Sequence, residues 1–300
     1  MRFQIIKENR SAFPVKKMCQ VFRVSPSGYY RWRTAPTAPG KLARQELQCA
    51  IKELYVRHKG MAGSPLITAD LHDRPEYAGV SRPRVARLMM EMGLKCRTVK
   101  KFVATTNAKH SEPVAANLLN RHFSTAAPNQ VWVSDITYLA IGGRWHYLSV
   151  FIDLFSRMVV GWDLSASLER HSTIKALQKA LWRRNPSKGL VIHSDRGIQF
   201  ASADFRAILN QQQCIQSMSR KGNCWDNAVA ESFFHTLKTQ LIHHCIFQSV
   251  NEAEKALFYY IEVYYNRQRK HSTNGYRSPA HFEQQWWNDY EGLNCMSIIL

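Results

Sequence analysis

The 300-residue sequence lacks several features that define large classes of proteins. No window approaches the roughly eighteen consecutive apolar residues of a membrane-spanning helix, and the N-terminal stretch "MRFQIIKENR" carries charges where a secretory signal would be apolar. The seven cysteines stand singly, without a CxxC pair, so neither a disulfide framework nor a cysteine zinc site is indicated. We therefore expect a cytoplasmic protein with reduced thiols and no membrane partner.

Acidic residues are scarce as well. The chain has 41 Lys+Arg against 22 Asp+Glu, a formal net charge of +19. Residues 1–105 alone hold 21 Lys+Arg and 7 Asp+Glu, a net of +14, which leaves +5 for the remaining chain. Such a localised excess favours a polyanionic partner, most often nucleic acid, over the alternative of a merely soluble basic protein.

Two segments of this basic region have the pattern of helix-turn-helix units. In residues 14–33, "PVKKMCQVFRVSPSGYYRWR", apolar residues recur at helical spacing, and Ser25 is placed to cap a second helix before Pro26. In residues 79–94, "GVSRPRVARLMMEMGL", Ser81 is the expected N-cap and Gly93 the expected C-cap, after another short helix at about 64–73.

The second unit has the better-defined face. Its apolar stripe leaves Arg84 and Arg87 on the opposite side, which suits a helix that enters a DNA groove; the stripe consists of Val85, Leu88, Met89 and Met92. A surface helix with solvated arginines has the same pattern, so this alternative stays open.

Composition divides the chain into four parts. We expect a helix-turn-helix-like segment at 1–45, a second DNA-binding domain at 46–105, a linker with one short helix at 106–127 and a catalytic core with a helical tail at 128–290. The linker region loses hydrophobic periodicity and is rich in Ala, Thr, Asn and Pro.

Strands dominate the start of the last part. Three β-rich runs with short connections, at 131–140, 144–154 and 157–165, predict an antiparallel meander. A helix at about 169–184, a strand at 190–194, a helix near 202–212, a strand at 214–219 and long helices at 226–243 and 251–266 follow. This order predicts a ribonuclease-H-like α/β fold, a mixed five-stranded sheet with helices on both faces.

Three acidic residues stand where this fold brings them together. Asp135 interrupts a buried strand in "WVSDITY", Asp195 follows a buried strand in "VIHSDRGIQF", and Glu231 shares a polar stripe with Asn227, His235 and Lys238 in the helix "WDNAVAESFFHTLKTQL". Adjacent strands would place the two aspartates at one sheet edge, with the helix carrying Glu231 above them. Gly197 is expected to let the chain turn away behind Asp195.

Three converging carboxylates repel one another, so a cation is expected among them. An all-oxygen donor set favours Mg²⁺ or Mn²⁺, and two ions would suit in-line displacement at phosphorus. Lys238 is placed to hold a phosphate. Zinc is not indicated at "HHC" (243–245), nor at His58 and His72. Asp153 and Asp163 join no motif, and we expect strand-end or solvent-facing positions for them.

The sequence resembles insertion-sequence transposases of the retroviral-integrase superfamily, specifically the second-reading-frame protein of the group named after insertion sequence three. The resemblance spans nearly the whole chain and is carried, in order, by "WVSDITYL", "HSDRGIQF", "KGNCWDNAVAESFFHTLK" and "YYNRQRKHSTNGYRSPAHFE". Thirty-five residues separate Asp195 from Glu231, as in the family's acidic triad, and Lys238 follows seven residues after the glutamate, as the family's basic residue does.

This resemblance implies a bacterial, nucleoid-associated enzyme that nicks element ends and transfers a 3′-hydroxyl strand. It implies DNA as partner, both terminal repeats and target, a homo-oligomer on that DNA, and fusion to or pairing with an upstream-frame helix-turn-helix protein.

Other residues have both a DNA-binding and a structural interpretation. Trp225 and Asn227 precede Glu231, His193 and Gln199 flank Asp195, and Arg269 and His271 stand in the tail motif. Two other functions remain open at this point: a ribonuclease or repair nuclease with the same carboxylates, and a DNA-binding regulator with an inert core.

Overall fold

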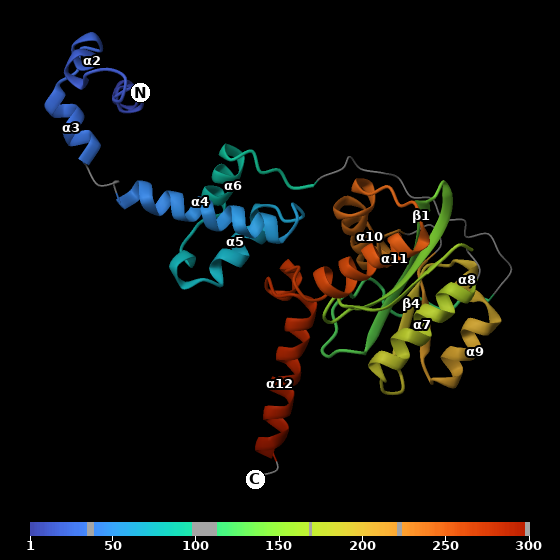
Figure 1. Ribbon diagram of the computed structural model, residues 1–300. Helices are drawn as coiled ribbons and strands as arrows, with labels where there is room; N and C mark the ends of the chain where they lie inside the picture. Colours follow the sequence, from blue (N-terminus) through green and yellow to red (C-terminus); the bar gives the residue numbers. More distant parts are fainter. Residues whose placement is uncertain (35–38, 98–112, 168–169, 221–223, 298–300) are drawn as a thin grey trace.

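The computed structural model describes residues 1–34, 39–97, 113–167, 170–220 and 224–297. Two small helical units are followed by an α/β domain, from which a last helix projects (Figure 1). None of the described helices combines the length and the apolarity that crossing a membrane requires.

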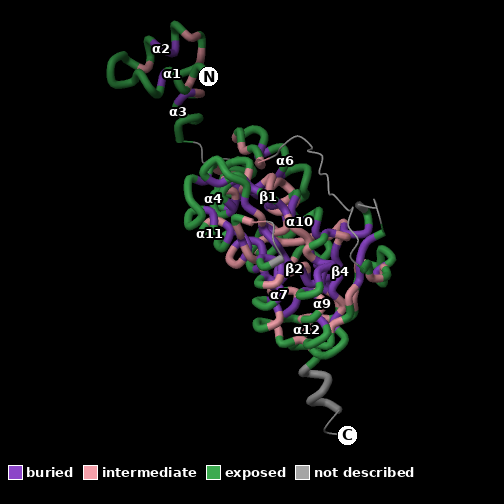
Figure 2. Tube along the Cα trace, turned by 90° about the vertical axis from the view of Figure 1, so that its right-hand side faces the viewer, coloured by how far each residue is buried: buried purple, intermediate pink, exposed green. Residues whose placement is uncertain are grey.

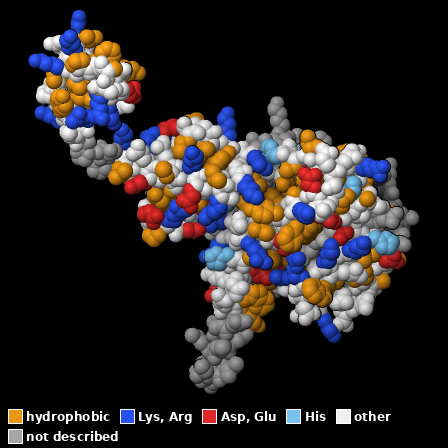
Figure 3. Space-filling view, viewed as in Figure 1, with side chains coloured by type: hydrophobic (Ala, Val, Ile, Leu, Met, Phe, Trp, Pro, Cys, Tyr) orange, Lys and Arg blue, Asp and Glu red, His pale blue; other side chains and the backbone are white. Residues whose placement is uncertain are grey.

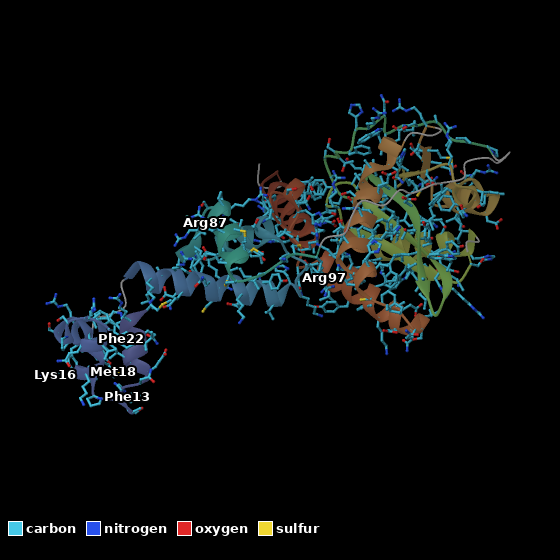
Figure 4. All side chains as sticks on the ribbon, turned by 90° about the horizontal axis from the view of Figure 1, so that it is seen from above. Phe13, Lys16, Met18, Phe22, Arg87 and Arg97 are labelled. Atoms are coloured by element: carbon cyan, nitrogen blue, oxygen red, sulfur yellow. The ribbon has the colours of Figure 1, made fainter. Side chains whose placement is uncertain are left out.

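The N-terminal unit packs three short helices, α1 (Arg2–Glu8), α2 (Val15–Val21) and α3 (Pro26–Thr34). Its small core contains Ile6, Met18, Cys19 and Tyr29, so the predicted apolar stripe is confirmed at its centre. Ser25 Oγ accepts a hydrogen bond from the Gly28 amide at 3.2 Å and caps α3 as expected. Lys and Arg side chains gather on this unit (Figure 3), while Figure 4 shows Met18 and Phe22 close together within it.

The second unit contains α4 (Pro39–Arg57), α5 (Ser64–His72), a 3₁₀ turn η1 (Pro75–Tyr77) and α6 (Arg82–Glu91). Val85, Leu88 and Met89 of α6 are buried against α4 and α5, as the periodicity predicts. Gly93 has a φ of +69°, the left-handed conformation expected of a C-terminal cap. The expected domain boundary between 45 and 46 falls inside α4, so this unit begins with the helix itself.

The α/β domain is built on a five-stranded sheet in the order β3-β2-β1-β4-β5. Its strands are β1 (Val131–Ile141), β2 (Arg144–Asp153), β3 (Val159–Ser165), β4 (Val191–Ser194) and β5 (Ile215–Met218). β1, β2 and β3 are antiparallel neighbours, whereas β4 runs parallel to both β1 and β5. The predicted mixed sheet, with its meander, is therefore confirmed.

Helices cover both faces of this sheet, and the strands between them are the most buried part of the molecule (Figures 1 and 2). One core lies under α10 (Ala228–Gln240) and α11 (Val250–Phe258), and the other lies under α7 (Arg170–Arg184), α8 (Ile198–Ala201) and α9 (Ala203–Gln211). Strand residues alternate between the two: Val133 faces α10, and Trp132 belongs to the opposite core.

Several elements differ in detail from the sequence expectation. The last long helix divides into α11 and a π-helical segment, η4 (Tyr259–Tyr265), and a 3₁₀ turn, η5 (Ser272–Asn274), precedes α12 (Pro279–Ser297). Two further 3₁₀ turns, η2 (Cys224–Asn227) and η3 (Ile242–His244), flank α10. The linker expected at 106–127 is described only at residues 113–127, which contain no helix; the rest of it lies outside the described residues. Residues 113–127 run instead along β5, where the Met218 amide bonds to Ala116 O.

The second helical unit is docked on the α/β domain. Gln240 Nε2, at the end of α10, donates to Met61 O at 3.0 Å, and Arg97 Nη1 donates to Gln240 O at 2.8 Å. Figure 4 shows Arg97 where the two parts meet. Lys270 Nζ also lies 2.6 Å from an Asp73 carboxylate oxygen. Met61 itself is buried in the core beneath α10.

Gly161 fixes the distance between β3 and α7. A Cβ at this position would lie 2.4 Å from Ala176 O and 2.6 Å from Ala180 Cβ, closer than any real contact. We expect Gly161→Ala to lower the free energy of unfolding by about 3 kcal/mol or more, because helix and strand must separate. Urea denaturation measures this. Gly79→Ala is the control, since nothing lies within 4 Å of its Cβ; equal stability of the two variants would contradict the close contact.

Candidate active site

Asp135 and Asp195 stand side by side because of the register of two parallel strands. β1 pairs with β4 through Val131↔Val191, Trp132↔Ile192 and Val133↔His193. Asp135 and Asp195 each follow the last pair, Val133↔His193, by two residues, so the two aspartates lie opposite each other. At this point β4 has ended and β1 continues. The convergence expected for these two residues thus follows from backbone pairing.

Glu231 reaches the same edge from α10. The buried face of this helix, Ala230, Phe233, Phe234 and Leu237, packs into the core on the Asp135 side of the sheet. Just before α10, Asn227 Nδ2 donates to Ser134 O at 3.1 Å and ties the helix start to β1 beside Asp135. Glu231 lies in the first turn of the helix, and its side chain is exposed to solvent.

The charges of the three acids act on one another. The pKa of Asp135 lies well above its usual value, first because the carboxyl is desolvated and then because the negative charges of Asp195 and Glu231 oppose its ionisation. The hydrogen bond from the Ile136 amide and the charge of Lys238 act in the opposite direction. The pKa of Glu231 is also raised by partial desolvation. The site therefore brings three acidic side chains close enough for their charges to interact, with Lys238 as an opposing charge.

Asp195 is held by the turn that follows β4. The Gly197 amide donates to Asp195 Oδ1 at 2.9 Å. Gly197 has φ −63° and ψ 141°, so the expectation that its backbone freedom turns the chain is wrong. Its lack of a side chain matters instead, because a Cβ there would lie 3.0 Å from both Asp195 Oδ1 and Gln199 Oε1.

Lys238 lies beside Asp135. The positive charge of Lys238 acts to lower the pKa of Asp135. Desolvation lowers the pKa of Lys238, and the negative charge of Asp135 acts against that shift. Lys238 Nζ is 5.0 Å from the centre of the Tyr138 ring. The ammonium group is thereby placed between the acids and an aromatic side chain on the same strand as Asp135.

The donor chemistry of the three acids fits a hard divalent cation. Carboxylate oxygens are the ligands that Mg²⁺ and Mn²⁺ prefer, and a cation would relieve the repulsion that raises the pKa of Asp135. Within the described ranges, however, no three carboxylate, histidine or cysteine side chains are grouped closely enough to hold one ion together. The charges of Asp195 and Glu231 nevertheless act on Asp135, and Glu231 is exposed to solvent.

A buried network behind the acids was missed by sequence reasoning. His193 Nδ1 accepts from Ser217 Oγ at 2.8 Å and His193 Nε2 donates to Asp226 O at 3.0 Å, which joins β4 to β5 and to the turn before α10. Burial lowers the pKa of His193 to about 4, so its ring is neutral. These contacts favour the structural interpretation of His193.

Asp226 anchors this network. Its side chain is fully buried and accepts hydrogen bonds from Asn117 Nδ2, Arg121 Nε and the backbone and guanidinium of Arg220. These donors, with Arg220 contributing most, hold the pKa of Asp226 far below its usual range. Asp226 stands five residues before Glu231 in the quoted motif, and no local pattern there indicates its burial or its partners.

The remaining candidates for DNA contact lie in different environments. Trp225 is 67% exposed. Gln199 lies on α8 near Asp195, half-buried. Asn227 is buried and bonded to Ser134 O, which favours a positioning role. Arg84 and Arg87 are exposed on α6, and Figure 4 shows Arg87 on the outer side of that unit.

Arg269 and His271 pack into the tail. Arg269 Nη1 donates to His271 Nε2 at 3.0 Å, and the Tyr265 ring lies 4.8 Å from the imidazole. Burial and the positive charges of Arg269 and Arg157 lower the pKa of His271 to about 3. This environment favours the interpretation in which Arg269 and His271 stabilise the packing of the C-terminal segment and do not bind phosphate.

Asp153 and Asp163 serve the fold. Asp153 ends β2, as expected, but it is buried; it accepts from the Asn129 amide at 2.7 Å and the Phe155 amide at 2.8 Å. Asp163 is paired with Lys179 at 2.7 Å. Neither residue contributes to the Asp135 site.

Comparisons with known proteins match two kinds of domain in this chain. Models of the integrase core domain match residues 125–224 and 231–286, and a model of an HTH-like domain matches residues 41–102. The chain is 42% identical to the insertion element IS600 uncharacterized 31 kDa protein of Shigella sonnei, over 90% of this chain and 98% of that protein. It is 39% identical to transposase InsF for insertion sequence IS3A of Escherichia coli (strain K12), over 95% of this chain and 99% of that protein.

Solved structures give a weaker likeness. A chain of a simian T-cell lymphotropic virus intasome, solved in complex with PP2A regulatory subunit B56 gamma, aligns with a TM-score of 0.46 and 19% identity, covering 72% of this chain and 74% of that chain. The HTLV-2 integrase catalytic core domain in complex with magnesium aligns with a TM-score of 0.41 and 19% identity, covering 53% and 98%.

The environment of His271 leads to a pH test. Because its pKa is about 3 in the folded chain against about 6.5 when unfolded, the stabilisation present above pH 6.5 is lost as pH falls toward 3. His271→Gln keeps an acceptor for Arg269 but cannot titrate. We expect the stability difference between wild type and variant to shrink by on the order of 3 kcal/mol between pH 7 and pH 4. Urea denaturation at each pH measures it, and a constant difference would contradict burial of a neutral imidazole.

Proposed function

The chain belongs to the IS3-family transposases, enzymes that transfer polynucleotide strands, and on this premise we propose that it cuts and joins DNA with Asp135, Asp195 and Glu231. The observation that carries the proposal is that Asp135 on β1 lies level with Asp195 just beyond the end of β4, with Glu231 close enough to oppose the ionisation of Asp135. No structural requirement of the sheet explains three coupled carboxylates at its edge.

The three carboxylates would hold Mg²⁺ or Mn²⁺, two ions per site. Bound there, the ions would activate the attacking oxygen and stabilise the leaving oxygen of an in-line displacement at phosphorus. The protein's own residues prepare this chemistry. Gly197 orients the Asp195 carboxylate through its amide, and Asn227 fixes the start of α10 to β1. Lys238, beside Asp135, would bind a phosphate of the DNA end.

Two successive reactions follow from this site. In the first, water attacks a phosphodiester at the element end, and the P–O3′ bond breaks to leave a 3′-hydroxyl and a 5′-phosphate. In the second, that 3′-hydroxyl attacks a target phosphodiester, so one P–O bond forms as another breaks. No covalent enzyme intermediate and no ATP are needed, because the number of phosphodiester bonds is conserved in the joining step.

The helical units would supply DNA recognition. Arg84 and Arg87 are exposed on α6 opposite its buried stripe, the arrangement of a helix that enters a DNA groove, and the basic region at 1–105 adds phosphate contacts. Trp225 and Gln199, near Glu231 and Asp195, would contact the DNA end. We also propose a homo-oligomer on terminal repeats and target DNA, joined to an upstream-frame helix-turn-helix protein. The HTH-like unit docked on the core favours this function over a general nuclease.

The acids provide the first test. Asp135→Asn, Asp195→Asn and Glu231→Gln should each reduce nicking and joining by at least roughly 10³-fold, because each removes an ion ligand that stabilises the transition state by several kcal/mol. Gel assays on labelled element ends with Mg²⁺, using the chain alone and fused to its upstream frame, measure both steps. Asp163→Asn is the matched control on the same sheet. If the activity of any of these three variants lies within tenfold of the wild-type activity, the substituted residue is not a metal ligand.

The metal provides the second test. Activity should require Mg²⁺ or Mn²⁺, fail with Ca²⁺, and be lost to EDTA but not to zinc-selective chelators. Mg²⁺ should also raise the melting temperature of the wild type, because an ion bound only by the folded state stabilises it. Differential scanning fluorimetry measures this shift in wild type and Asp195→Asn. An equal shift in the variant would mean that Mg²⁺ binds elsewhere.

A further inference from the structure

Two large aromatic side chains are exposed on the hairpin that extends from the active site. Tyr138 of β1 is 43% exposed and Trp145 of β2 is 59% exposed. Their rings lie edge to face with centres 5.1 Å apart. Neither side chain belongs to a hydrophobic core, so this pair, the Tyr138–Trp145 platform, offers apolar surface to water without a role in folding.

The platform is connected to the acids through β1 and Lys238. Tyr138 follows Asp135 by three residues on β1, about 10 Å along the strand. Because side chains alternate along a strand, the Tyr138 ring points to the sheet face opposite Asp135 and reaches the acids around the edge of β1 that β4 leaves free. Lys238 Nζ lies 5.0 Å from the Tyr138 ring centre and also acts on the charge of Asp135. β4 pairs with β1 only at residues 131–133, so β4 does not cover this part of β1.

The chemistry around the platform suits a nucleic-acid strand. Lys238 lies on one side, and Arg144 is exposed next to Trp145. A cationic border attracts phosphates, whereas the aromatic faces can stack on any base. A second protein chain would instead need an apolar surface of much larger area than two side chains supply.

We propose that Tyr138 and Trp145 form a stacking site for one unpaired base of the DNA end whose phosphate lies at Asp135. Successive nucleotides rise about 3.4 Å in a stacked duplex and lie farther apart once unstacked, so a platform about 10 Å along β1 takes a base within roughly three nucleotides of the reacting phosphate. The base must leave the duplex stack to reach the rings, so the site holds the end of the DNA frayed. This inference rests on the proposed function, because it takes the acids as the point of attack.

Photocrosslinking tests the site directly. The full chain is mixed, in Ca²⁺, with element-end duplexes that carry 5-iodouracil at one position at a time, and crosslinked peptides are mapped by mass spectrometry. We expect crosslinks to Tyr138 or Trp145 with a maximum within about three nucleotides of the scissile phosphate. If neither Tyr138 nor Trp145 is crosslinked at any labelled position, the proposal is overturned.

Binding measurements supply the matched variants. Trp145→Ala should weaken binding of an end with unpaired terminal bases on the order of tenfold, because a stacking contact is lost. Trp182→Ala, which removes an indole that is 88% exposed on α7, should leave affinity unchanged. Tyr138→Phe keeps the aromatic ring and should retain wild-type affinity. Melting temperatures of the three variants equal to that of the wild type exclude misfolding. Equal affinity of Trp145→Ala and wild type would overturn the proposal.

Two further outcomes separate the explanations. If Trp145→Ala converts an oligomer to a monomer in sedimentation and leaves the crosslinks unchanged, the platform belongs to an interface between copies and the proposal fails. If the crosslinks form as expected but wild type and Asp135→Asn are equally inactive in Mg²⁺, both alone and fused to the upstream frame, the proposed catalytic function fails while the stacking site stands.

Discussion

Repulsion between carboxylates is the constraint on which the rest of the structure depends. Two parallel strands in fixed register bring Asp135 and Asp195 to one level, and α10 adds the charge of Glu231. A folded chain that leaves such charges uncompensated loses stability, so the surrounding structure must hold them in place. The neutral His193, the buried Asp226 and the amide of Gly197 do this from behind and beside the site.

The sequence was sufficient for the sheet and for the approach of the acids because both depend on local patterns. The β-rich runs and short connections define the meander, and a carboxylate in or just after a buried strand marks the edge where strands end. The part of β1 and β2 that carries Tyr138 and Trp145 lies beyond the end of β4, and this arrangement depends on strand pairing that no local pattern encodes.

Other features depend on contacts between distant segments and could not be predicted. Asp226 is an ordinary acidic residue in its motif, and only folding brings Arg121 and Asn117 to it from more than a hundred residues away. His271 has the sequence appearance of a phosphate ligand, but Tyr265 and Arg269 enclose it. The boundary expected at residue 45 falls within α4, which is continuous from Pro39 to Arg57, so a change in composition there does not coincide with the end of a helix.

The docking of the HTH-like unit on Gln240 has a mechanical consequence. Glu231 and Gln240 are nine residues apart on α10, about 13 Å along a single rigid helix. The same rod therefore carries an acid of the active site at one end and the hydrogen bonds to Met61 and Arg97 at the other. A displacement of the docked unit would therefore be transmitted to Glu231 through one helix and no loop, which would couple the proposed DNA contacts of that unit to the position of a proposed metal ligand.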